Sequence, residues 1–159
     1  MASTAIVLCY RDEYQHVLQQ QRGDFEVLLV NEWLLSVKDK LPQRTLSTSQ
    51  SYVWFSHCTE SANKPSTAAE WQQIFKRFGI QLDSVNVGCC GMAGTYGHEA
   101  VNLDNSKNLY AMSWQQALDQ YAQAQVLISG YSCRSQVKRL SKFRAKHPLE
   151  AILDLIKRG

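Results

Sequence analysis

With 159 residues, of which 45% are apolar, the chain is long enough for one globular domain with a substantial core. Its net charge of +3 is too small to indicate a nucleic-acid-binding protein. The sequence contains neither an apolar run long enough to cross a bilayer nor a secretory signal. We therefore expect no transmembrane segment and a cytoplasmic protein, which could still lie peripherally on the inner face of the cell membrane.

The first fifty residues are interpreted as a helical N-terminal part. Residues 10–21 and 25–37 have helical spacing, although the second range is also partly strand-like, and residues 38–50 read as a polar loop. After residues 1–3 the chain enters the mostly apolar stretch 4–10 directly, with no leader before it. We infer a single domain, residues 1–159, cut from a longer polypeptide.

Residues 51–159 form the predicted α/β core, because strand and helix signals alternate along them. Aromatic and β-branched runs predict the strands, and apolar side chains at helical spacing predict the helices. The predicted strands are residues 51–56, 84–87 and 126–129, and the predicted helices are residues 67–78, 105–124, 135–143 and a last one beginning at Pro148. This alternation implies right-handed crossovers and a small parallel sheet of about three strands covered by helices.

The five cysteines are an odd number in a chain without an export signal, which favours reduced thiols for metal or redox chemistry over a disulfide framework. Four of them, Cys58, Cys89, Cys90 and Cys133, come just after predicted strands. The carboxyl ends of parallel strands meet at one edge of a sheet, where such folds bind ligands, so these four thiols should converge. Cys9 lies in an apolar stretch and is interpreted equally well as a core residue or a fifth ligand.

Gly88, Gly91 and Gly94 surround the adjacent Cys89 and Cys90. A Cys-Cys pair is awkward as a local disulfide but can present two thiolates to a metal or an iron–sulfur cluster, and glycines let the backbone approach the sulfurs. Zinc usually takes cysteines in close pairs two to four residues apart, which this chain lacks. The alternative is that these cysteines are small buried apolar residues.

Two neighbours of the cysteines are further candidates. We interpret His57 as a hydrogen-bond donor to a sulfur, with metal ligand and core histidine as alternatives. Cys133 precedes the helix expected from residue 135. The amide ends of that helix and the positive Arg134 should lower the pKa of the thiol and help it to bind metal.

Residues 89–95, Cys-Cys-Gly-Met-Ala-Gly-Thr, resemble the signature of the cysteine-rich CCG domain family. That family includes one subunit of heterodisulfide reductase and the iron–sulfur subunits of glycolate oxidase and anaerobic glycerol-3-phosphate dehydrogenase. The chain most resembles the C-terminal iron–sulfur region of FAD-linked bacterial dehydrogenases that oxidise D-2-hydroxy acids such as D-lactate or D-2-hydroxyglutarate. Residues 7–14 and 130–139 also resemble that group.

The family pattern is a cysteine, then Cys-Cys-Gly, then Cys-x-x-Cys. Cys58, the adjacent pair and Cys133 match it, and the resemblance implies that they are metal ligands. Gly130 stands where the family has another cysteine, and Ile6 stands where many members have an early one. These departures favour an ordinary four-cysteine site, or a site without a cluster, over the five-cysteine noncubane site of heterodisulfide reductases.

The resemblance implies an electron-transfer domain with a 4Fe-4S cluster, which air would remove from an isolated domain. FAD in a domain absent from this chain would take hydride from the substrate, and an acceptor such as quinone would receive the electrons. The FAD-linked oxidase domain, in the same polypeptide or complex, is the expected partner, so this chain alone should be inactive on substrate. The alternatives are a zinc-binding module, a thiol-redox module with a Cys58–Cys89 or Cys90–Cys133 disulfide, and a cluster-free docking module.

Overall fold

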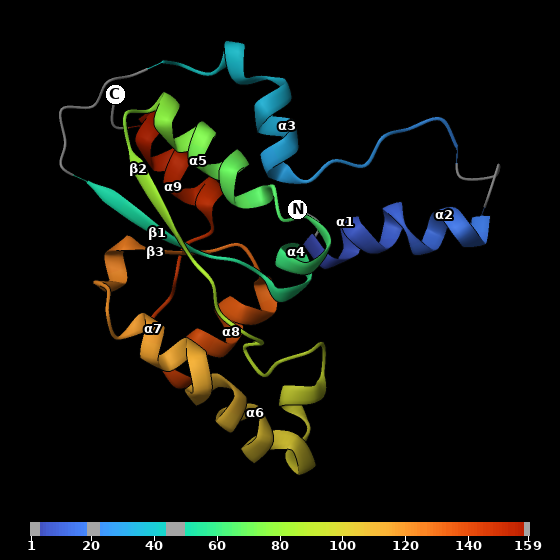
Figure 1. Ribbon diagram of the computed structural model, residues 1–159, viewed down its shortest axis with the longest axis vertical. Coiled ribbons are helices and arrows are strands. Elements are labelled where there is room, and N and C mark those ends of the chain that lie inside the picture. The colour runs from blue at the N-terminus through green and yellow to red at the C-terminus, as the bar shows by residue number, and fades with distance from the viewer. Residues whose placement is uncertain (1–3, 19–22, 44–49, 158–159) are drawn as a thin grey trace.

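The computed structural model describes residues 4–18, 23–43 and 50–157. Its three strands are β1 (Ser51–Phe55), β2 (Gln81–Val85) and β3 (Val126–Ile128). They form one parallel sheet in the order β2-β1-β3, with β1 in the centre (Figure 1). The predicted fold class, a small parallel sheet of about three strands covered by helices, is confirmed.

Helices cover both faces of this sheet (Figure 1). One face carries α3 (Val30–Ser36), α5 (Thr67–Arg77) and α9 (Pro148–Lys157), and the other carries α6 (Leu103–Tyr110), the π-helical turn η5 (Ala111–Gln115), α7 (Gln116–Leu118) and α8 (Tyr131–Leu140). Successive side chains of β1 point to opposite faces. Tyr52 and Trp54 therefore pack with α5 and α9, whereas Val53 and Phe55 pack with the helices of the other face.

The remaining elements are α1 (Thr4–Arg11), α2 (Glu13–Leu18), α4 (Cys58–Asn63) and the short 3-10 turns η2 (Lys38–Lys40), η3 (Tyr96–His98), η4 (Ala100–Asn102) and η6 (Gln123–Gln125). Helices α1 and α2 form an arm that extends away from the sheet (Figure 1). Among the described residues, no helix has both the length and the apolar composition needed to cross a membrane.

A group of charged side chains joins the arm to the body. The Arg11 guanidinium of α1 donates to the Glu32 carboxylate of α3, with an Nη1–Oε1 distance of 3.0 Å. Lys64, just after α4, pairs with the same carboxylate and also with Glu70 of α5, where the Nζ–Oε1 distance is 3.1 Å. Since α1 also contacts α4, these ion pairs fix the arm beside the helix that carries Cys58.

The predicted boundaries in the N-terminal part are wrong in several places. Helix α3 begins only at Val30, because Leu29 is extended and its N–H is capped by the Glu32 side chain at 2.7 Å. The predicted helix over residues 10–21 is replaced by two short helices that together cover residues 4–18, apart from Asp12. Residues 19–21 of that prediction, and residues 44–49 of the predicted polar loop, lie outside the described part of the chain.

Three boundaries in the core also differ from prediction. Strand β2 begins at Gln81 and ends at Val85, since Leu82 already belongs to the buried core. The helix predicted over residues 105–124 ends at Leu118 and contains the π-helical turn. Helix α8 begins at Tyr131 rather than at residue 135, so Cys133 lies inside its first turn.

Candidate functional site

Four cysteines lie in the segments that follow the carboxyl ends of the three strands. Cys58 is the first residue of α4, which follows β1. Cys89 and Cys90 lie in the segment after β2, and Cys133 lies in α8, which follows β3. The four cysteines differ in solvent exposure. Cys58 is exposed, Cys89 is half-buried, and Cys90 and Cys133 are buried in the core cluster between the sheet and α8.

The thiols approach each other as two pairs. Cys89 interacts with Cys58, and the charge on Cys58 would also reach Cys133. Cys90 and Cys133 form the second pair through a side-chain hydrogen bond. Residues that are 31 to 75 positions apart in the chain are thus brought together by the parallel topology.

The two buried thiols titrate in opposite directions. The hydrogen bond from Cys133 lowers the pKa of Cys90 to about 7, against the opposing effect of burial. The same bond, together with burial, raises the pKa of Cys133 well above its ordinary value. The two neighbouring thiols therefore favour one negative charge between them over two, and they titrate as a pair. The pKa direction predicted for Cys133 from its helix and Arg134 is wrong, because the neighbouring Cys90 dominates.

A tight turn at Gly91 shapes the segment that carries the adjacent cysteines. Gly91 has a φ of +84°, and a Cβ built on it would lie 2.2 Å from the carbonyl oxygen of Ser106, so no other residue fits. Its N–H points toward Cys89 Sγ, at 3.4 Å, which partly offsets the burial that raises the pKa of that thiol. Gly94 also has a positive φ, whereas Gly88 contributes its carbonyl oxygen to a hydrogen bond.

His57 connects the first and third cysteine-bearing turns. Its Nδ1 accepts a hydrogen bond from the N–H of Thr59 at 3.3 Å, which caps the start of α4, and its Nε2 lies 3.3 Å from the hydroxyl of Ser132. Burial lowers its pKa, so the ring is neutral at pH 7. Both ring nitrogens thus have partners in neighbouring segments of the chain. A hydrogen bond from His57 to a sulfur stays a prediction.

The side chain of His57 also occupies the space beside Gly130, the position where the resemblance led us to expect a cysteine. A Cβ at Gly130 would lie 2.5 Å from Cδ2 of His57 and 2.9 Å from Sγ of Cys133. A side chain at this position would therefore require its neighbours to move.

Cys9 is not a member of the two thiol pairs. It lies on α1 in a groove shared with Thr59 and Asn63 of α4. A hydrogen bond with Glu13 raises its pKa, and burial acts in the same direction. A role for Cys9 as a fifth ligand stays a prediction.

The donor set suits an iron–sulfur cluster in its chemistry, because cysteine thiolates are the usual ligands of such clusters. As the side chains stand, the thiols form two pairs. Across residues 4–18, 23–43 and 50–157, no group of three or more His, Cys, Asp or Glu side chains is arranged to hold a metal ion. Coordination by Cys58, Cys89, Cys90 and Cys133 remains a prediction that would need their side chains to turn toward a common centre.

Sequence reasoning missed Glu60, which is 1% exposed. Its Oε2 accepts a hydrogen bond from the backbone N–H of His57, at 3.3 Å, and one from the hydroxyl of Ser129. Burial raises the pKa of this carboxyl, and the Ser129 hydrogen bond opposes that shift. The same arrangement, in which the backbone N–H of a histidine donates to a glutamate three residues later, recurs at the start of α9. There the N–H of His147 donates to Glu150 at 2.7 Å. In both cases histidine stands where the usual capping box has serine or threonine, which is why this pattern did not indicate the start of α4.

Comparison with known proteins identifies relatives over nearly the whole chain. It is 52% identical to D-2-hydroxyglutarate dehydrogenase of Escherichia coli strain K12 over 96% of its length, and 43% identical to the protein of the same name from Pseudomonas putida over 97%. A subunit of the anaerobic glycerol-3-phosphate dehydrogenase of Escherichia coli strain K12 is 24% identical over 97% of the chain.

The chain spans only 15% of the length of those two D-2-hydroxyglutarate dehydrogenases and 39% of the length of the glycerol-3-phosphate dehydrogenase subunit. No protein-family model matches the chain, and no solved structure matches it. The resemblance predicted from the sequence to D-2-hydroxy-acid dehydrogenases and to a glycerol-3-phosphate dehydrogenase subunit is confirmed.

Proposed function

We propose that this homologue of one segment of the D-2-hydroxyglutarate dehydrogenases is an iron–sulfur electron-transfer domain of a flavin-dependent D-2-hydroxy-acid dehydrogenase. The observation that carries the proposal is the arrangement of Cys58, Cys89, Cys90 and Cys133 as two interacting thiol pairs at one edge of the sheet. The family relationship supports a dehydrogenase context for these thiols.

The chain's own residues account for the ligand set and its surroundings. The four cysteines would hold a 4Fe-4S cluster, which when bound accepts and releases single electrons. The turn at Gly91 brings main-chain amides toward the sulfurs, and hydrogen bonds of that kind stabilise negative charge on thiolates. Cys90 needs little further help to ionise near neutral pH, because its pKa is already about 7.

The remainder of the reaction belongs to other parts of the dehydrogenase. FAD in another domain of the same polypeptide or complex would oxidise the D-2-hydroxy acid, and an acceptor such as quinone would receive the electrons. This chain would carry the electrons from FAD to the acceptor. Cys58 is the exposed member of the set, so its side of the site is where a neighbouring redox group would come closest.

The test is the iron and acid-labile sulfide content of the whole chain, purified without oxygen and also reconstituted anaerobically with iron and sulfide. We expect about four of each per chain, with broad absorption near ~400 nm. Serine at any of the four positions, for example Cys89→Ser, should remove most of the iron. Cys9→Ser is the matched control and should keep it, because Cys9 takes no part in the two thiol pairs.

Two results would contradict the proposal. One is the absence of iron from both preparations, and the other is an equal loss of iron in the Cys9→Ser control. Stoichiometric zinc in place of iron would instead assign the thiols to a zinc site. A metal-free chain that still binds the flavin-containing part of the dehydrogenase would support the docking module.

Thiol–disulfide exchange is a second candidate, favoured by the hydrogen-bonded Cys90–Cys133 pair. A thiolate beside a protonated thiol is the arrangement from which exchange begins. Because both thiols are buried, the oxidant would be a small disulfide that enters the site; Cys90 would attack one of its sulfurs, and Cys133 would then displace the attached sulfur. The pair loses two electrons and two protons, and the small disulfide becomes two thiols.

Thiol counting separates the two candidates. Metal-free protein would be equilibrated in buffers of defined dithiol and disulfide ratio, quenched with acid, unfolded so that the buried thiols become accessible, alkylated and mapped by mass spectrometry. Exchange chemistry predicts that Cys90 and Cys133 become protected together, also in a Cys58→Ser, Cys89→Ser double variant. Continued alkylation of both under oxidising conditions would exclude this candidate.

A further inference from the structure

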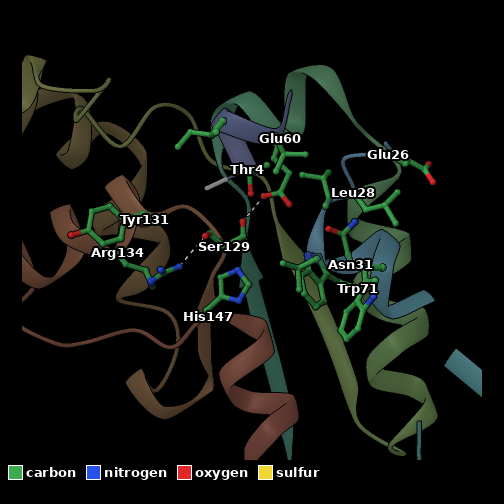
Figure 2. A pocket seen from close by; sticks show the side chains of 15 residues that line it. Thr4, Glu26, Leu28, Asn31, Glu60, Trp71, Ser129, Tyr131, Arg134 and His147 are labelled. Atoms are coloured by element: carbon green, nitrogen blue, oxygen red, sulfur yellow. Dashed lines mark hydrogen bonds between the residues drawn. The ribbon is translucent and has the colours of Figure 1, made fainter. Parts of the chain in front are cut away.

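A cavity of about 600 Å³ lies between α1, the start of α3 and the carboxyl edge of the sheet (Figure 2). This volume is within the range of pockets that bind small molecules. The wall on the side of α1 and α3 is mostly apolar, with Ile6, Val7, Leu28, Leu29, Val30 and Trp33, and it also includes Thr4 and Asn31. The opposite wall carries polar side chains from α4, α5, α8 and the segments after β3, none of which is a cysteine of the thiol site.

The indole of Trp71 supplies the first of these polar groups. Trp71 is 1% exposed and lines the cavity. Its Nε1 is buried and has no hydrogen-bond partner among the described residues. The nearest acceptor is the Glu60 carboxyl, whose pKa the indole N–H lowers, although the two groups do not meet the geometric criteria for a hydrogen bond. A buried N–H left unpaired costs stability, which an acceptor from a ligand would recover.

His147 supplies a second donor beside the first. Its ring lies edge-on to Trp71, with 5.9 Å between ring centroids, and it also lines the cavity. Nδ1 accepts the N–H of Leu149 at 3.1 Å, so the neutral ring carries its proton on Nε2. Burial, helped by the charge of Arg134, lowers its pKa to about 4, which keeps the ring neutral at pH 7.

Arg134 supplies positive charge to the same wall. Its Nη1 donates to the carbonyl oxygens of Ile128 and Ser129, at 2.9 and 2.8 Å. These neutral acceptors hold the guanidinium in place at one side of the cavity, near Ser129, without cancelling its charge (Figure 2). A fixed, half-buried guanidinium is well suited to binding a carboxylate.

Two acidic side chains line the cavity, and a third lies near its positive charge. Glu60 already accepts hydrogen bonds from Ser129 and from the backbone of His57. Glu26 is exposed on the side of α3. Glu150 is outside the lining but interacts with the charge of Arg134. The donor wall combines two N–H groups and one positive charge, opposite a mostly apolar wall.

From this arrangement we propose that the cavity binds a small aliphatic carboxylic acid, with its carboxylate at Arg134, Trp71 and His147 and its chain against the apolar wall. A dianion such as phosphate fits less well, because the donor wall offers a single full positive charge and the facing wall is apolar. The site does not require the thiols to hold a cluster, so its test is independent of the proposed electron-transfer role.

The test is a ligand-observed NMR titration of the whole chain with acetate, butyrate and hexanoate, and with hexanamide and inorganic phosphate for comparison. We expect saturable binding that tightens from acetate to hexanoate, by up to about fourfold per buried methylene. Hexanamide, which has the same shape without the charge, should bind at least tenfold more weakly than hexanoate.

Two variants of the cavity and one control test whether hexanoate binds there. Arg134→Gln should weaken hexanoate at least tenfold, whereas Lys76→Gln removes an equal charge from an exposed site on α5 and should change nothing. Since Arg134 also holds two carbonyl groups, Leu28→Trp provides a second variant, which fills the cavity from its apolar wall and should abolish binding without touching a donor. All variants would first be checked for the thermal unfolding midpoint of the parent.

Several outcomes would overturn the assignment. These are no saturable binding of any carboxylate, equal affinity for hexanoate and hexanamide, tighter binding of phosphate than of hexanoate, and unchanged hexanoate binding in a folded Leu28→Trp variant. The last would place the carboxylate site elsewhere on the molecule.

Discussion

The indole Nε1 of Trp114 donates a hydrogen bond of 2.8 Å to the carbonyl oxygen of Gly88. Trp114 is fully buried in the π-helical turn, and Gly88 is the residue immediately before the adjacent cysteines. The bond therefore joins the helical layer to the segment that carries Cys89 and Cys90. The Trp114 ring also packs against Phe55 of the central strand, with 5.5 Å between the two ring centroids.

Trp114→Phe should loosen this connection. The variant loses the hydrogen bond and leaves a partial cavity, so we expect the free energy of unfolding to fall by about 2 to 3 kcal/mol. Trp33→Phe removes the same atoms from an exposed position on α3 and should change stability by less than about 0.5 kcal/mol. Urea unfolding measures both. Equal stability of the two variants would show that the hydrogen bond to Gly88 contributes nothing.

Gly91→Ala should be among the most damaging single-methyl additions in the chain. The new Cβ would clash with the carbonyl oxygen of Ser106 and would also require a left-handed backbone, so we expect a loss of about 3 kcal/mol or more. Gly94→Ala is the matched control, because Gly94 also has a positive φ but has no atom within 4 Å of the new Cβ. It should cost only about 1 to 2 kcal/mol. Thermal unfolding compares the two, and a Gly94→Ala variant as unstable as Gly91→Ala would contradict the steric argument.

Gly130 and His57 should be energetically coupled. Gly130 has an ordinary φ of −69°, so a Gly130→Ala variant suffers only from contact with the His57 ring and Cys133. We expect it to lose about 1 to 3 kcal/mol by overpacking. In a His57→Ala background much of that loss should disappear, giving a coupling energy of at least about 1 kcal/mol in a double-mutant cycle. Strict additivity would mean that the space beside Gly130 is limited by another group.

The parts of the fold that could be predicted from sequence are those with long, regular patterns. The strand at residues 51–55 and the helices α5 and α9 are amphipathic or strongly apolar, and their burial decides their structure. The parallel topology then predicted that the turns after the strands, and their cysteines, lie at one edge.

What could not be predicted depends on contacts between distant segments. Helix α4 is short and polar, and it is capped by the side chain of His57, a residue type seldom expected at that position. The titration of Cys133 is decided by Cys90, which is 43 positions away, rather than by its own helix. The unpaired indole N–H of Trp71 has no sequence signature, since its place in a helical apolar pattern indicates only core.

Acidification should destabilise the fold through His147. Its pKa in the folded protein is about 4, below the ordinary value of 6.5, because of burial and the charge of Arg134. Between these values the unfolded chain binds a proton that the folded chain does not, so stability falls as the pH falls. From pH 7 to pH 5 this histidine should account for a loss of about 2 kcal/mol. His57, whose pKa burial also lowers, adds to the loss with the same sign. Urea unfolding of the parent and of His147→Asn at both pH values measures the effect. Asparagine can still cap α9, so the variant should lose clearly less stability on acidification, and an equal loss would show that His147 does not titrate as described.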